Sequence, residues 1–111
     1  MIGPERDKLP VLYLTTTGRT SGLPREIEIW YVADGERLYL LAENFHKTQW
    51  VRNIQADPNV KIRLRGTERT GIARVLDYER DRELWNLAQR LGREEYGWGE
   101  GLPVEIVLGA N

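Results

Sequence analysis

The segment from Thr15 to Arg25, TTTGRTSGLPR, concentrates side chains that bind anions. It joins two apolar stretches, for which a plain hairpin would need only a two-residue turn. Its candidate ligand-binding groups are the hydroxyls of Thr16, Thr17 and Ser21 and the guanidinium groups of Arg19 and Arg25. Arginines hold phosphate or carboxylate by charge-assisted hydrogen bonds, and glycines allow close backbone approach. The alternative is a long, solvated hairpin loop, and the residue types favour the two interpretations equally.

A second polar cluster, residues 44–47, precedes a predicted helix. The first turn of a helix has unpaired N–H groups and a partial positive charge, so it attracts anions. The candidate ligand contacts here are Asn44, Lys47, Trp50 and Asn53. We interpret His46, the single histidine, as a surface residue. No carboxylate lies at a metal-ligand spacing from it, so we expect no metal site.

Several aromatic residues lie near polar clusters. Trp30 shares one face of a predicted strand with Glu26 and Glu28. A tryptophan beside two carboxylates is unusual on a solvated face, so we expect a ligand, a partner subunit or a helix to cover it. Tyr96 and Trp98 lie in a glycine-rich stretch, where they either fold over a flat ligand or plug the end of a barrel.

Short strands and two helices must position these residues. Apolar runs and period-two alternation predict strands over residues 9–15, 26–32, 37–42, 60–65, 68–76 and 102–109. Helical periodicity predicts helices over residues 48–57, with Thr48 as the N-cap, and 77–91. The apolar stripe of the second helix comprises Leu84, Trp85, Leu87, Ala88 and Leu91. Asp34-Gly35 predicts a hairpin turn, and residues 92–101 an irregular loop. About six antiparallel strands with two inserted helices predict a mainly β fold, a small barrel or roll.

Composition limits the function classes. With 111 residues, the chain is expected to form a single domain over residues 1–111. A net charge of −1 lacks the basic excess of a nucleic-acid binder, and the absence of cysteine excludes disulfides and thiol catalysis. No apolar run reaches the ~20 residues of a membrane span or follows the N-terminus as a signal peptide does. We therefore expect a cytoplasmic protein without stable membrane insertion.

Several stretches together resemble the deazaflavin-dependent nitroreductase and quinone reductase family. They are LYLTTTGRTSGLPREIEIWYV, then RLYLLAEN and WVRNIQADPNVKIRL, and finally YGWGEGLPVEIV. The Thr-Thr-Gly-Arg-x-Ser-Gly loop, the Trp-x-x-Asn helix and the Pro-x-Val strand entry follow in the family's order and span nearly the whole chain. Members of this family resemble split β-barrel flavin and deazaflavin oxidoreductases, so the resemblance implies that fold.

The resemblance also implies a cofactor, coenzyme F(420), a deazaflavin with a phospholactyl-glutamate tail. Its anionic tail suits Arg19, Arg25 and Lys47. Its flat, apolar ring suits Trp30, Trp50 or Tyr31. The other implied cofactor contacts are Thr16, Thr17, Ser21, Asn44 and Asn53. Reduced F(420) is expected to pass a hydride to a quinone, nitro compound or activated enone, with Tyr96 or solvent supplying a proton. Split barrels of this size commonly pair through their sheets, so a homodimer is expected.

Departures from better-known members keep other cofactors open. Thr20 stands where those members have a lysine, and Ile27-Glu28 stands where they have an Asn-Pro pair. A lost lysine and a gained glutamate make the site less favourable for a long anionic tail. FMN, with one phosphate, is therefore the alternative cofactor, and haem is a further one. A non-catalytic protein that holds a flavin or tetrapyrrole, or a purely structural domain, is the alternative to an enzyme.

Overall fold

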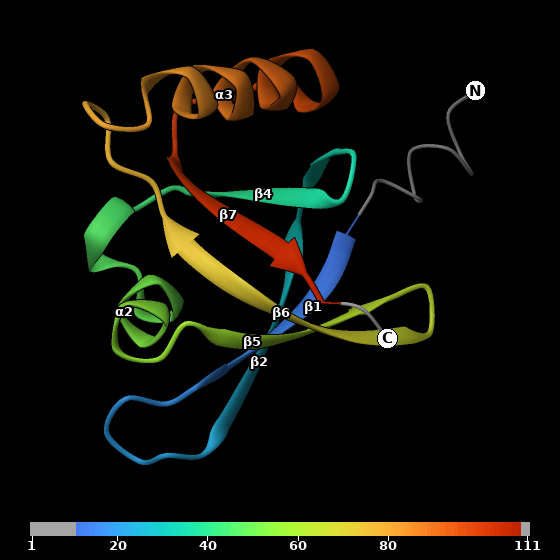
Figure 1. The fold of residues 1–111 in the computed structure, drawn as a ribbon, viewed down its shortest axis with the longest axis vertical. Helices are drawn as coiled ribbons and strands as arrows, with labels where there is room; N and C mark the ends of the chain where they lie inside the picture. The colour runs from blue at the N-terminus through green and yellow to red at the C-terminus, as the bar shows by residue number, and fades with distance from the viewer. Residues whose placement is uncertain (1–10, 110–111) are drawn as a thin grey trace.

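The computed structural model describes residues 11–109 and shows a curled antiparallel sheet with two α-helices (Figure 1). The strands are β1 (Val11–Thr17), β2 (Pro24–Trp30), β3 (Val32–Asp34), β4 (Arg37–Ala42), β5 (Asn59–Leu64), β6 (Thr67–Val75) and β7 (Leu102–Leu108). The helices are α2 (Gln49–Ala56) and α3 (Arg82–Tyr96), and a short 3-10 helix, η1 (Phe45–Lys47), precedes α2. Leu9 and Pro10, with which the first predicted strand begins, lie outside the described residues.

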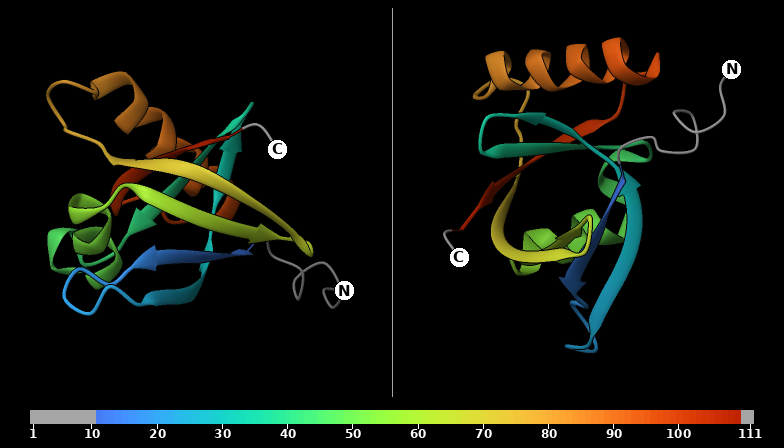
Figure 2. Two further views of the ribbon diagram at one scale, coloured as in Figure 1. Left: turned by 60° about the horizontal axis from the view of Figure 1, so that its bottom comes forward. Right: turned by 90° about the vertical axis from the view of Figure 1, so that its right-hand side faces the viewer.

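The order of the strands forces the sheet to curl. Neighbouring strands are antiparallel in the order β2-β1-β5-β6-β7-β4-β3. The two outer strands, β2 and β3, are separated in the chain by Tyr31 alone. One residue spans ~3.5 Å, far less than the width of a flat sheet whose strands lie ~4.8 Å apart. The sheet therefore closes on itself at Tyr31. Figure 2 shows the curled sheet from two sides. This seam confirms the predicted split barrel.

Alternation along the strands gives the sheet an apolar inner face. Leu12 of β1, Leu40 of β4 and Ile106 of β7 are completely buried there. The apolar side of α2 packs into the same core through Val51 and Ile54. Each such side chain contributes ~1.5–3 kcal/mol when it leaves water. This core fixes α2 against the barrel and so fixes every residue that α2 carries toward the site.

A second core lies on the outer face, where α3 packs against β3, β4 and β7 (Figure 1). Tyr39, which points outward from β4, is buried beneath α3 together with Ala88 of the helix. The predicted stripe of Leu84, Trp85, Leu87, Ala88 and Leu91 lies in this core. The helical periodicity thus identified the correct face of α3.

The predicted strand over residues 26–32 is two strands in the structure. β2 pairs with β1 and ends at Trp30, whereas β3 pairs with β4 and begins at Val32. Between them, the backbone carbonyl of Tyr31 accepts a hydrogen bond from the Tyr96 hydroxyl. The prediction of six strands is therefore wrong by one, because the alternation of side chains continues across the break.

The second helix begins and ends later than predicted. The carboxylate of Asp77 accepts hydrogen bonds from the two backbone N–H groups at positions 79 and 80 (3.1 and 2.9 Å). This local turn competes with helix formation, so α3 begins only at Arg82. The helix ends at Tyr96, and Gly97 follows in the left-handed conformation (φ 77°). The first residues of the predicted 92–101 loop, up to Tyr96, are therefore helical.

The remaining elements match their predictions closely. α2 has Thr48 at its N-cap and Asp57 at its C-cap, although the Thr48 side chain makes no capping hydrogen bond. The Asp34-Gly35 turn joins β3 to β4, with Gly35 at φ 66°. Across residues 11–109, no helix is long and apolar enough to cross a membrane.

Candidate functional site

Two cavities lie beside α2 and share the Trp50 side chain as a wall. The larger, about 740 Å³, lies at the seam between β2 and β3, and we call it the aromatic cavity. Its lining includes Trp30, Tyr31, Tyr39, Trp50, Tyr96 and Trp98, with Glu28, Glu43, Asn44 and Thr48. The smaller, about 520 Å³, lies between α2 and the β1–β2 loop, and we call it the arginine cavity. Its lining includes Thr16, Gly18, Arg19, Thr20, Ser21, Arg25, Gln49 and Asn53. Figures 1 and 2 show this loop beside α2.

The β1–β2 loop is held in shape by its own backbone. The Gly18 N–H donates to the Leu23 carbonyl, and the Gly22 N–H donates to the Gly18 carbonyl, both at 2.8 Å. Gly22 has φ 74°, which residues with a side chain rarely adopt. A Cβ on Gly18 would lie 2.7 Å from Ser21 Oγ and 3.4 Å from Arg25 Nε. Glycine at position 18 therefore leaves room for the Ser21 and Arg25 side chains beside the loop backbone.

Asn53 fixes this loop to α2. The residue is 5% exposed, and its Nδ2 donates to Thr16 Oγ1 at 3.1 Å. Its Oδ1 accepts from the backbone N–H of Arg19 at 3.2 Å and from Arg19 Nη1 at 2.8 Å. These bonds satisfy both buried polar side chains, which removes the cost of burying them. Thr16 and Asn53 thus shape the arginine cavity by holding the loop in place.

The two arginines of the arginine cavity differ in their contacts. Arg19 is committed to α2, because its Nη2 also donates to Gln49 Oε1 at 2.7 Å. Arg25 is exposed, and its guanidinium has no hydrogen bond or ion pair with any residue between 11 and 109. Arg25 is therefore the cation most available to an anionic ligand, and Arg19 lies beside it with a guanidinium already oriented.

Trp30 and Tyr96 form one wall of the aromatic cavity. Their rings stack with centroids 4.6 Å apart and an interplanar angle of 15°. The Tyr96 hydroxyl donates to the Tyr31 carbonyl, which ties α3 to the seam. Burial, assisted by the negative charge of Glu95, raises the pKa of Tyr96 to about 12. The phenol is therefore neutral at physiological pH.

Trp98 reaches the aromatic cavity because two glycines let its segment lie close to the rest of the protein. A Cβ on Gly99 would lie 2.0 Å from the Gln89 carbonyl oxygen of α3. A Cβ on Gly101 would lie 2.8 Å from Trp98 Cη2 and 2.9 Å from the Ala42 carbonyl oxygen. The glycine-rich stretch, expected to form a lid or a plug, forms a closely packed wall.

The two cavities carry opposite charge. Arg19 and Arg25 line the arginine cavity, and no carboxylate does so within the part of the chain that the structure describes. Glu28 and Glu43 line the aromatic cavity, and no lysine or arginine of the described residues is part of that lining. An anionic group is therefore favoured in the arginine cavity and disfavoured in the aromatic cavity.

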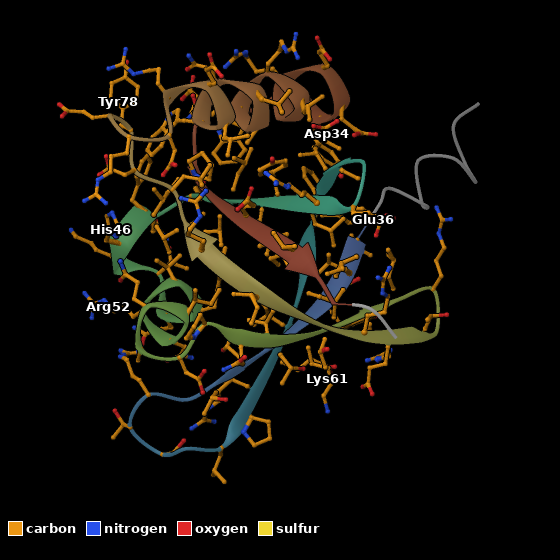
Figure 3. The ribbon with its side chains drawn as sticks, viewed as in Figure 1. Asp34, Glu36, His46, Arg52, Lys61 and Tyr78 are labelled. Atoms are coloured by element: carbon orange, nitrogen blue, oxygen red, sulfur yellow. The ribbon has the colours of Figure 1, made fainter. Side chains whose placement is uncertain are left out.

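The cavities bring together most of the residues predicted from sequence. Thr16, Arg19, Ser21, Arg25, Trp50 and Asn53 line the arginine cavity, whereas Trp30, Asn44, Trp50 and Tyr96 line the aromatic cavity. Lys47 is exposed and lines neither. Thr17 also lines neither cavity, and its side chain instead interacts with Asp57. Hydrogen bonds from Asn59 lower the pKa of the Asp57 carboxyl, and a hydrogen bond from Thr17 makes a smaller contribution. His46 is exposed and points away from the body of the protein (Figure 3), as expected of a surface residue.

Several residues of the cavities escaped the sequence analysis as site residues, among them Gln49, Thr48 and Glu43. Gln49 lies one helical turn before Asn53, and this i to i+4 spacing was the signal for a shared face of α2. Thr48 was expected only as a cap, yet its Oγ1 is buried and has no hydrogen-bond partner in the described part of the chain. Nothing in the sequence indicated that Glu43 would line a cavity, because it is a single polar residue after a strand.

The chain is similar to several solved structures. An F(420)-H(2) dependent reductase (FDR-A) is 24% identical, with a TM-score of 0.67 over 88% of this chain and 93% of that one. A structure described as a domain-swapped dimer is also 24% identical, with a TM-score of 0.66 over 88% and 79%. The heme storage protein HutZ from Vibrio cholerae is 20% identical, with a TM-score of 0.65 over 99% and 90%. At these identities, the likenesses show a shared fold.

The family follows from the sequence itself. A family model described as F(420)H(2)-dependent quinone reductase matches residues 1–107, nearly the entire chain. The matched region contains the loop, helix and strand motifs on which the resemblance was based, and the two cavities lie within it. The chain therefore belongs to the F(420)H(2)-dependent quinone reductase family, which is a family of enzymes.

Proposed function

We propose that this protein reduces a quinone, a nitro compound or an activated enone with F(420)H(2) as the reductant. The observation that carries the proposal is that Trp50 lines both the wide aromatic cavity and the cationic one. F(420) has the same two-part character, a flat ring joined to an anionic tail. One ligand that extends past Trp50 would satisfy both cavities.

The residues of each cavity fit one part of this cofactor. In the arginine cavity, Arg25 and Arg19 would hold the phosphate of the tail, with the Ser21 hydroxyl beside them. In the aromatic cavity, Trp50 and Trp30 offer flat apolar surface to the ring. A volume of about 740 Å³ lies within the usual range of small-molecule sites. We infer that it accommodates the ring and an acceptor together.

The chemistry divides between cofactor and protein. Bound F(420)H(2) supplies a hydride, and the protein binds, orients and shields the reactants. Trp98 and Tyr96 would exclude water from one side of the aromatic cavity. The proton for the reduced acceptor is proposed to come from the Tyr96 hydroxyl or from solvent. For Tyr96 to donate it, the hydrogen bond to the Tyr31 carbonyl must first open.

Hydride transfer can be tested with purified protein, F(420)H(2) and menadione, by following the reappearance of oxidised F(420). We expect a saturable rate that Arg25→Ala lowers through a weaker affinity for F(420)H(2). Arg90→Ala, an exposed residue of α3 that lines neither cavity, serves as the control. Tight binding of F(420) without transfer to menadione, a nitroarene or an enone would indicate a carrier protein instead.

An FMN-dependent reductase of the same fold is the second candidate. The observation that favours it is the single uncommitted guanidinium of the arginine cavity, Arg25, which suits one phosphate. A non-catalytic flavin or tetrapyrrole holder is a further alternative, for which haemin is the probe. Parallel titrations with F(420), FMN and haemin separate these cofactors by affinity.

We also propose a homodimer and a cytoplasmic location. Ile72 and Val107 are register partners on the outer face of β6 and β7, and they are 52% and 41% exposed. A solved structure of the same fold is described as a domain-swapped dimer. Light scattering at several concentrations should give twice the chain mass, and a constant monomer mass would contradict the dimer. Cell fractionation tests the location.

A further inference from the structure

We infer that the aromatic cavity selects planar electron acceptors that are neutral or positively charged and discriminates against anionic ones. That electron acceptors bind in this cavity rests on the proposed function. Its preference among ligand charges rests on the lining residues alone. The inference combines a stacking surface, a set of unpaired carboxylates and the absence of a cation from the described lining.

Trp30 provides the stacking surface. It is 46% exposed, which is unusual for an indole, although one of its faces is covered by the Tyr96 ring. Tyr96 cannot move freely, because its hydroxyl is bonded to the Tyr31 carbonyl. The exposed side of Trp30 is therefore a fixed, flat platform at the cavity. Planar ring systems stack on such a platform in an offset geometry.

Carboxylates determine which charge this platform accepts. Glu28 and Glu43 are exposed and line the cavity. Neither makes an ion pair with any lysine or arginine in the described range, residues 11–109. Glu95 adds negative charge nearby, since its field raises the pKa of Tyr96, behind the effect of burial. An anionic acceptor would therefore enter a cavity whose two lining carboxylates form no ion pair, whereas the tail of the cofactor has the arginine cavity available.

The expected size of the effect follows from Coulomb's law. A carboxylate ~6 Å from an anion in a water-like medium weakens its binding about threefold, and two carboxylates weaken it about tenfold. Because both glutamates are exposed, salt should screen the effect. A discrimination of this size is measurable by calorimetry, and its dependence on salt separates it from a steric effect.

The experiment uses three naphthoquinones with one ring system and different charge. One is unsubstituted, one carries a sulfonate and one carries a trimethylammoniomethyl group. Their affinities for the protein without reductant are measured at about 0.01 M and about 0.3 M salt. We expect the sulfonate to bind about tenfold more weakly than the neutral quinone at low salt, and the ammonium compound to bind at least as tightly. The difference should shrink at high salt.

Variants assign the effect to the residues. In the Glu28→Gln, Glu43→Gln double variant, the sulfonate should bind nearly as well as the neutral quinone. Glu79→Gln, an exposed carboxylate that lines neither cavity, should leave the discrimination unchanged. Trp30→Leu should weaken all three quinones by a similar factor. Equal affinities for the three charges in the unaltered protein, or discrimination that survives the double variant, would overturn the inference.

A separate titration with oxidised F(420) keeps the two proposals apart. If F(420) fails to bind while the quinones still show charge discrimination, the proposed function fails and the preference of the cavity stands. If F(420) binds and the charge discrimination is absent, the inference about the acceptor fails and the cofactor site stands.

Discussion

Asn53 of α2 accepts two hydrogen bonds from Arg19, one from its backbone N–H at 3.2 Å and one from its guanidinium at 2.8 Å. The two residues lie 34 positions apart in the chain. With the third bond, from Asn53 Nδ2 to Thr16 Oγ1, they connect the buried end of β1, the β1–β2 loop and α2. The shape of the arginine cavity depends on this connection.

Replacement of Asn53 by leucine should therefore destabilise the protein. The change removes three hydrogen bonds and leaves the buried Thr16 hydroxyl without its partner. We expect a loss of ~2–4 kcal/mol in the free energy of unfolding, measured by urea denaturation. Gln55→Ala, at an exposed position of the same helix, should change it by less than ~0.5 kcal/mol. Equal stability of the two variants would show that the connection contributes nothing to folding.

Gly101→Ala should disturb the aromatic cavity. The added Cβ would lie 2.8 Å from Trp98 Cη2 and 2.9 Å from the Ala42 carbonyl oxygen, so Trp98 must move. We expect a destabilisation of ~1–3 kcal/mol and a weaker affinity for the naphthoquinones. Gly109→Ala is the matched control, because its Cβ would meet nothing closer than 3.4 Å. If both alanine variants bind quinones equally well, Trp98 is not needed to form the cavity.

The stability of the protein should fall above pH 10, and Tyr96 should contribute to that fall. Burial raises the pKa of Tyr96 to about 12, whereas the ordinary pKa of a tyrosine is 10.0. Between these values the unfolded chain loses the phenolic proton while the folded chain keeps it. The stabilisation is therefore complete below pH ~10 and is lost as the pH rises toward 12. Unfolding free energies of the unaltered protein and Tyr96→Phe should converge over this range, and parallel curves would contradict the assignment.

Tyr96→Phe also tests the proposed proton donor. If the hydroxyl gives its proton to the acceptor, kcat should fall about 10²-fold while the affinity for F(420) is kept. Phenylalanine keeps the ring that stacks on Trp30 and loses only the bond that fixes it, so the affinity for naphthoquinones should fall much less than kcat. An unchanged kcat would assign the proton to solvent.

Much of the fold could be predicted because its signals are local. Alternation in β4 separates Leu40, which faces the inner core, from Tyr39, which faces α3. Thr48 and Asp57 bound α2 because both residues have an extended backbone, which cannot continue the helix. The boundaries of α3 were harder, since the carboxylate of Asp77 bonds to backbone N–H groups that a helix would otherwise use.

The site could be predicted only in part, because it depends on contacts between distant segments. Tyr96 and Tyr31 are 65 positions apart, and no local sequence pattern predicts the hydrogen bond that joins them at the break between β2 and β3. Arg19 and Gln49 are 30 positions apart, so the hydrogen bond that holds Arg19 against α2 could not be predicted from local sequence. The residue types did identify the arginine loop and the aromatic residues. Their division into a cationic and an acidic cavity required the structure.

We propose that one ligand extends past Trp50, with its ring in the aromatic cavity and its tail in the arginine cavity. Calorimetric titration of F(420) and of the same deazaflavin without its phosphate tail, into the unaltered protein and Arg25→Ala, tests this claim most directly. We expect Arg25→Ala to weaken the binding of F(420) about tenfold and to leave the affinity for the tail-less ring unchanged. An equal effect on both ligands, or no effect on either, would contradict it.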